Sequence, residues 1–282
     1  MSAFTSISEA DLTPAPDSSA KVVPGGSGWR GNPGVLLLLL LVAAFSVFYF
    51  ALSLLRYTEF YATNWDLGIG MQSLWTLTQG YPANAAGNYE FVGAGSFFFI
   101  HTTYILIPVA GLYGLVPSAS TLFALQAVVV ASSAIPLYLI GRAARVPVWL
   151  LLVALTVYLG SFPIVSAVLF DFHWEAFILA EFLWTYYLWD RGRYWAALIP
   201  VTAGLLTLEV FPVLMVGLVV YFAYPFLVSL RRTPRAALHD LIAHPRRAAP
   251  LLGLLVLVAL AHFLLSYLTA EGLPLLTGES PT

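Results

Sequence analysis

Cysteine is absent from the 282 residues of this chain, and charged side chains make up only 9% of them. The lack of cysteine excludes disulfide bonds and thiolate metal sites. The scarcity of charge falls far below the roughly 25% that is usual in soluble domains. Basic residues do not outnumber acidic ones, since the net charge is −2, and the chain therefore lacks the basic surface of a nucleic-acid-binding protein.

Apolar residues are abundant instead, at 60% of the chain, and they recur in long runs. A hydrocarbon core of ~30 Å requires about 20 mainly apolar residues for each crossing helix. Several runs meet this length. The sequence predicts an all-α, polytopic bundle of transmembrane helices in a lipid bilayer.

The N-terminal residues 1–34 are rich in Ser, Pro, Gly and Ala, and we expect a disordered cytoplasmic tail there. The apolar run at 35–55 could belong to a signal peptide, but it is longer than an h-region of about 7–15 residues. We interpret it as a retained first crossing. The predicted transmembrane domain covers 35–269, and 270–282 form a short external tail.

Further crossings are expected in the apolar segments 119–140, 146–167, 174–189, 194–229 and 249–268. The run at 194–229 would measure ~54 Å as one helix, which exceeds one crossing. Glu209 and Pro212 interrupt it, so we expect two helices that form a hairpin.

Two segments of the expected external loop 56–118 are predicted to lie on the membrane surface. The first, 66–79, carries Leu67, Met71, Leu74 and Trp75 at the spacing of an amphipathic helix. The second, 98–116, should not cross, because only then do all three arginine-bearing connections become cytoplasmic under the positive-inside rule. These connections contain Arg142 and Arg145, Arg191 and Arg193, and Arg231, Arg232, Arg235, Arg246 and Arg247.

Seven crossings follow, with the N-terminus inside and the C-terminus outside. The alternative is that 98–116 crosses and the first crossing is reversed. In the first topology, acidic and histidine side chains from distant segments share the external face. They are Asp66, His101, Asp171, His173, Glu175 and Glu209.

Some of these residues also have a simpler structural interpretation. Asp66 stands where Asp is favoured as a helix cap. Asp171, His173 and Glu175 would point to one side of an extended chain, which suits a divalent metal, but in a helix His173 would turn away. Glu181 lies in the middle of an expected crossing, where a hydrogen bond to a neighbouring helix is the simplest explanation.

Four motifs, in order, resemble the signatures of the prokaryotic membrane-protein family called domain of unknown function 2079. They are WDLGIGMQSLWTLTQG at 65–80, FFFIHTTYILIPVAGLYGLVPS at 97–118, LFDFHWEAF at 169–177 and LTLEV at 206–210. That family is similar to the C-type glycosyltransferases, which take a sugar from a polyprenyl-phosphate carrier on the external face. At the fourth motif the family commonly has Lys-Glu-Asp, where this chain has Leu208, Glu209 and Val210.

The resemblance implies hexosyl or pentosyl transfer from a polyprenyl-phosphate-linked sugar. We expect Asp66 and Glu209 to be catalytic, and Asp171, His173 and Glu175 to hold Mg²⁺ or Mn²⁺ against the donor phosphate. His101, Arg56 and Gln72 are the expected substrate-binding residues. Two alternatives stay open: a proton-coupled transporter that uses Glu181 and Glu209, and a non-catalytic membrane scaffold.

Overall fold

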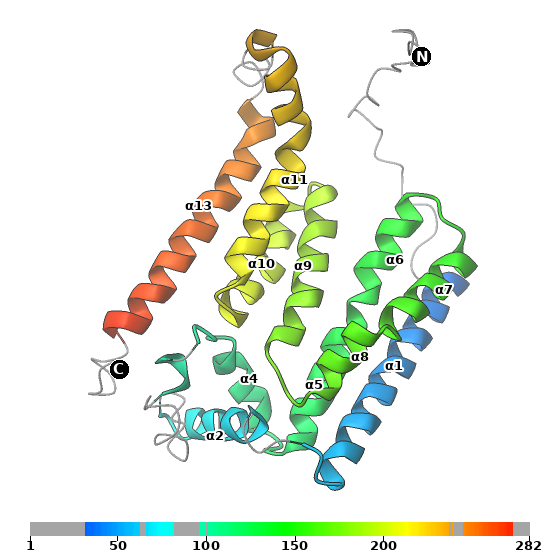
Figure 1. Cartoon of the computed structure of the whole chain (residues 1–282), viewed down its shortest axis with the longest axis vertical. Coiled ribbons are helices and arrows are strands. Elements are labelled where there is room, and N and C mark those ends of the chain that lie inside the picture. Colours follow the sequence, from blue (N-terminus) through cyan, green and yellow to red (C-terminus); the bar gives the residue numbers. More distant parts are fainter. Residues whose placement is uncertain are drawn as a thin grey trace, which may run out of the picture.

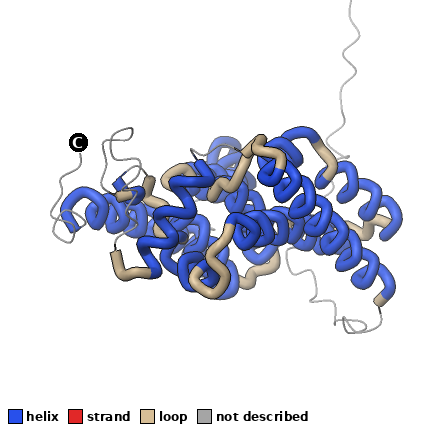
Figure 2. The backbone as a smooth tube through the Cα atoms, turned by 90° about the horizontal axis from the view of Figure 1, so that it is seen from below, coloured by secondary structure: helices blue, strands red, loops and turns tan. Residues whose placement is uncertain are grey.

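A computed structural model describes residues 32–62, 66–81, 96–99, 101–236, 239 and 245–272. Residues 1–31 of the predicted tail at 1–34 and most of the predicted C-terminal tail lie outside these ranges, and residues 33 and 34 are already helical. Every secondary-structure element of the described chain is a helix or helical turn, and Figure 2 shows helices joined by short loops with no strand. In chain order the elements are α1 (Pro33–Thr58), α2 (Asp66–Thr78), the 3₁₀ turn η3 (Phe97–Phe99), α4 (Leu106–Tyr113), α5 (Ala119–Ser132), α6 (Ala134–Ala143), α7 (Val148–Leu159), α8 (Phe162–Leu169), α9 (Glu175–Asp190), α10 (Tyr194–Thr207), α11 (Phe211–Arg232), α13 (Pro245–Tyr267) and the π turn η4 (Leu268–Gly272).

Within the described ranges, four helical stretches are long and apolar enough to cross a membrane. They are Pro33–Thr58, Ala119–Ala143, Phe211–Arg232 and Ala249–Gly272. A fifth is added if α7 and α8, which meet at a bend of 47°, together form one crossing. The prediction of an all-helical protein with several helices able to cross a membrane is therefore confirmed for the described residues.

The chain runs back and forth along the long axis of the molecule (Figure 1). α1 descends to the lower end, the α5–α6 stretch returns upward, and α7 with α8, α9, α10, α11 and α13 follow in alternating directions. α9 and α10 have 16 and 14 residues, and they pack closely against each other. The segment predicted not to cross, 98–116, contains the eight-residue α4, which is too short to span ~30 Å.

The start of α1 follows from its sequence. The side chain of Asn32 accepts a hydrogen bond from the Gly34 N–H at 3.0 Å, and Pro33 occupies the first turn, where its missing N–H costs nothing. Farther along, the buried Tyr49 hydroxyl donates to the Leu159 carbonyl at 2.6 Å, where α7 ends. This bond ties α1 to the bend between α7 and α8.

An apolar layer at the lower end fixes α2 across the ends of the long helices (Figure 1). Leu74 of α2, Leu106 of α4 and Leu122 of α5 are completely buried in it. Of the four apolar residues predicted on one face of α2, Leu67 and Leu74 are buried, Met71 is partly buried and Trp75 is 51% exposed. The buried residues of α2 are Leu67, Ile69, Gly70, Ser73, Leu74 and Thr76.

Candidate functional site

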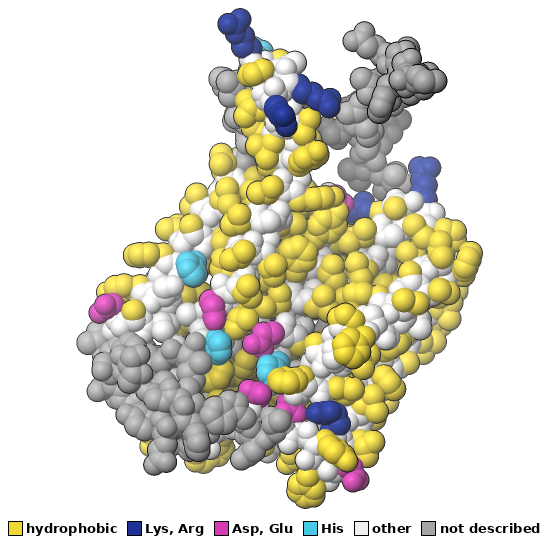
Figure 3. All heavy atoms as spheres, in the orientation of Figure 1, with side chains coloured by type: hydrophobic (Ala, Val, Ile, Leu, Met, Phe, Trp, Pro, Cys, Tyr) yellow, Lys and Arg dark blue, Asp and Glu magenta, His cyan; other side chains and the backbone are white. Residues whose placement is uncertain are grey.

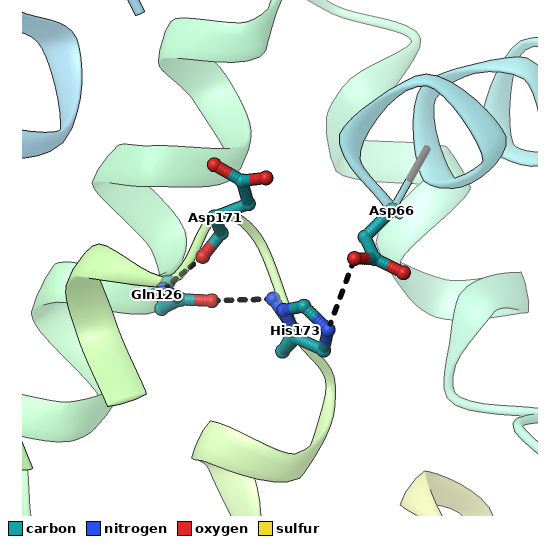
Figure 4. Close-up of polar contacts among 4 residues, drawn as sticks. All are labelled: Asp66, Gln126, Asp171 and His173. Atoms are coloured by element: carbon teal, nitrogen blue, oxygen red, sulfur yellow. Dashed lines mark hydrogen bonds and ion pairs between the residues drawn. The ribbon is translucent and has the colours of Figure 1, made fainter. Parts of the chain in front are cut away.

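Asp66 and His173 face each other at the lower end of the bundle (Figure 4). Asp66 lies in the first turn of α2, and His173 lies in the turn between α8 and α9. Their nearest atoms, Oδ2 of Asp66 and Nε2 of His173, are 3.8 Å apart. This separation is too long for a direct hydrogen bond but within reach of a small side-chain rotation. Both side chains are partly exposed, so a ligand can approach them.

The turn that carries His173 has an unusual backbone. Asp171 has a φ of 126°, a region that non-glycine residues avoid at a cost of about 1–3 kcal/mol. Its side chain is buried, and Figure 4 shows the carboxylate directed away from His173. On the other side of the turn, the ring of Phe170 packs against the His173 ring with centroids 4.9 Å apart.

A second pair of acid and imidazole joins Glu209, in the connection between α10 and α11, to His101, in the segment between η3 and α4. Nδ1 of His101 and Oε1 of Glu209 are 2.9 Å apart, a hydrogen-bond distance. Nearby, the Ile105 N–H donates to the Leu206 carbonyl at 2.8 Å, which ties the segment after His101 to the end of α10. Burial tends to raise the pKa of Glu209, but the hydrogen bond and charge of His101, with backbone hydrogen bonds, lower this pKa below its ordinary value.

The two pairs come from connections at the same end of the bundle (Figure 1). Figure 3 shows acidic and histidine side chains gathered in the lower half of the visible face, near this end. Most of the visible lysine and arginine side chains lie at the opposite end. Sequence analysis expected the acids and imidazoles to share one end. It did not predict their pairing, Asp66 with His173 and His101 with Glu209.

The other expected site residues line three open cavities. Gln72 borders a cavity of about 970 Å³ together with Tyr57, Trp75 and Tyr113. The exposed Glu175 lies beside His173 at an apolar groove of about 460 Å³.

Arg56, the positively charged residue among the expected substrate-binding residues, also lies beside a cavity. Arg56 borders a groove of about 310 Å³ on the other flank of α8, and its guanidinium donates to the Tyr61 carbonyl at 3.1 Å. Phe170 lines both this groove and the one at Glu175.

The three expected metal ligands do not converge. Glu175 begins α9, Asp171 is buried, and His173 faces Asp66, because the turn is not the extended strand that the spacing argument assumed. In the described part of the chain, no group of three or more His, Asp or Glu side chains could hold a metal ion. The divalent ion stays a prediction.

Glu181 is buried in α9, and its Oε1 accepts a hydrogen bond from the Thr207 hydroxyl of α10 at 2.7 Å. The expected hydrogen bond to a neighbouring helix is therefore present. Among the described residues, no hydrogen bond or ion pair joins Glu181 to Glu209 or to His173.

One important residue escaped the sequence analysis. Gln126 is 1% exposed in α5, and its amide contacts the turn that carries His173 (Figure 4). A signal was available, because a glutamine between Leu125 and Ala127 in an apolar segment needs polar partners.

A family model described as "Predicted membrane protein (DUF2079)" matches residues 56–274. The chain belongs to this family. The DUF2079 match confirms the family resemblance, and it covers both pairs, Gln126 and the residues that line the three cavities. No curated protein and no solved structure matches the chain. The DUF2079 description specifies a membrane protein without an activity.

Proposed function

We propose that this DUF2079 protein transfers a sugar from a polyprenyl-phosphate carrier at the extracytoplasmic face of the membrane. The observation that carries the proposal is the Asp66–His173 pair, which is partly exposed and whose His173 lines an apolar groove along a candidate membrane-spanning segment. A lipid-linked donor needs both features in one place, a polar reaction centre and an apolar path for the chain.

The two grooves along α8 fit such a donor. The larger one is lined by apolar side chains, including Pro163, Ile164 and Leu179, and its polar end is formed by His173 and Glu175. Arg56 lies beside the smaller groove and supplies a positive charge for a lipid phosphate. This cation offsets the repulsion that nearby carboxylates exert on a phosphate.

The cavity at Gln72 suits the sugar or the acceptor. Its lining combines the rings of Tyr57, Trp75 and Tyr113 with the neutral amide of Gln72, and the described residues around it include no charged side chain. Apolar rings with a few polar groups are typical of small-molecule sites.

In the proposed reaction, an acceptor hydroxyl attacks the anomeric carbon of the sugar as the bond from that carbon to the phosphate oxygen breaks. Polyprenyl phosphate leaves with the bonding electron pair, and the Asp66 carboxylate takes the proton of the hydroxyl. His173, 3.8 Å away, orients this carboxylate after a small side-chain rotation brings the two within hydrogen-bond distance, and the His101–Glu209 pair provides a second proton-exchanging group.

The proposal includes the topology of seven crossings with the N-terminus inside and the C-terminus outside. The arginine-bearing ends of α6, α9 and α11 lie at the end opposite α2, which is the arrangement that the positive-inside rule favours. α9 and α10 would be the shortest crossings, supported by their packing against each other.

Purified protein in liposomes tests the proposal when it receives polyprenyl phosphate that carries a radiolabelled hexose or pentose, with a membrane extract as acceptor. We expect label to leave the carrier only when the protein is present. Binding without release of label would favour a scaffold. Proton uptake without release would favour a transporter, for which the buried Glu181, whose Oε2 has no described partner, would be the first residue to test.

A further inference from the structure

The side-chain amide of Gln126 makes three hydrogen bonds to the backbone of the turn between α8 and α9 (Figure 4). Its Nε2 donates to the carbonyl of Val168 and to that of Asp171, each at 2.9 Å. Its Oε1 accepts from the backbone N–H of His173 at 2.8 Å. One buried side chain thus bonds to the backbone of three residues: Val168 at the end of α8, Asp171 with its positive φ, and His173.

The fit between this amide and the turn is chemically specific. Two donors and one acceptor are required at once, and among side chains of this size only an amide supplies them. A carboxylate would lose the donors, and an apolar side chain would leave two carbonyl groups and one N–H without partners in a buried place.

The turn needs such support because of Asp171. A backbone held at a φ of 126° relaxes unless surrounding contacts hold it. The bonds from Gln126 act on both sides of Asp171, at Val168 and at His173, and on Asp171 itself. Relaxation of this turn would move the His173 ring relative to α2, where Asp66 lies.

We propose that Gln126 is the positioning residue of the site, which sets His173 against Asp66 from within the bundle. The hydrogen bonds described for its amide all go to the backbone, and none goes to the ring or the carboxylate of the pair. The inference builds on the pair used in the proposed function, but it concerns geometry and can be tested without any substrate.

The absence of native cysteine makes a direct test practical. A protein carrying Asp66→Cys and His173→Cys has two thiols at the positions of the pair. The bond from Gln126 survives, since it reaches the backbone of residue 173 and not its ring. A short bis-methanethiosulfonate reagent then links the two thiols, and mass spectrometry of the linked peptides gives the rate.

We expect Gln126→Met to slow this linkage roughly tenfold or more, the factor expected when buried hydrogen-bonding groups lose their partner. Gln79→Met is the matched control, because Gln79 is exposed and its side chain bonds only to the neighbouring Thr78 hydroxyl among the contacts described. It should link at the parental rate. An unchanged rate in Gln126→Met would overturn the proposal.

Gln126→Glu serves if the methionine variant does not yield a monodisperse protein. It retains an acceptor for the His173 N–H, so linkage should be faster than with methionine and slower than with glutamine, and a parental rate would again refute the proposal.

In the sugar-transfer assay with native Asp66 and His173, Gln126→Glu should lower kcat more than it raises KM. Failure of transfer in the parental protein would count against the proposed function and leave the linkage result intact.

Discussion

Replacement of Gly204 by alanine places a methyl group where the ring of Phe211 already lies. Gly204 is in α10, and Phe211, which is fully buried, begins α11. A Cβ atom at 204 would overlap three ring carbons of Phe211, so the ring or the helices must move. Between the two residues the chain makes the tight connection that carries Glu209.

The expected cost follows from two opposing terms. Overpacking of a buried contact costs about 1–3 kcal/mol. The change from glycine to alanine inside a helix returns about 0.8–1 kcal/mol. The net loss is then up to roughly 2 kcal/mol, and at about 2–4 °C for each kcal/mol in a chain of this size the apparent Tm should fall by several degrees.

The matched control is Gly217→Ala in α11, where an added Cβ meets nothing within 4 Å. Thermal unfolding in detergent, followed by the fluorescence of the eight tryptophans, compares the two variants. Gly204→Ala should unfold below the parental protein, and Gly217→Ala at or above it. Equal apparent Tm values for both variants would show that Phe211 does not fill the space beside Gly204.

Three further outcomes are expected. Because the pKa of Glu209 is lowered from 4.5, the His101–Glu209 pair adds stability above that pH and loses it as the pH falls through the lowered pKa, so the difference in apparent Tm between the parental protein and Glu209→Gln should shrink on acidification. A cysteine at Ser118 should react with a membrane-impermeant maleimide in intact cells, and one at Arg193 only after permeabilisation; the reverse pattern would refute the topology. If the divalent ion is required, chelation should abolish sugar transfer and Mg²⁺ or Mn²⁺ restore it, whereas transfer that persists in excess chelator would rule the ion out.

Helix type and helix position were largely predictable from the sequence, because crossing helices need long apolar runs. The break in 194–229 was found from Glu209 and Pro212, and the structure places it between Thr207 and Phe211. The buried face of α2 was harder to predict from the sequence. Its aromatic Trp75 faces a cavity, and small residues such as Gly70 and Ser73 pack inward.

The site was predictable as a set of residues but not as an arrangement. Local spacing suggested that Asp171, His173 and Glu175 act together, but the positive φ of Asp171 and the start of α9 direct them apart. The contacts of His173 with Asp66 and Gln126 join positions 107 and 47 residues away, and no periodic pattern reports such pairing. A single sequence shows which polar groups need partners and leaves their partners open.

The role of Asp66 as the proton acceptor is tested most directly by the initial rate of sugar transfer in Asp66→Asn. Asparagine matches the volume and capping ability of aspartate at a helix start but cannot take the proton. Asp190→Asn, at the far end of α9, is the matched control. We predict a fall of about 10²–10⁴-fold for Asp66→Asn, with an unchanged apparent Tm and a parental rate in the control. Transfer at the parental rate in Asp66→Asn would contradict the account and leave Asp66 with a structural role at the start of α2.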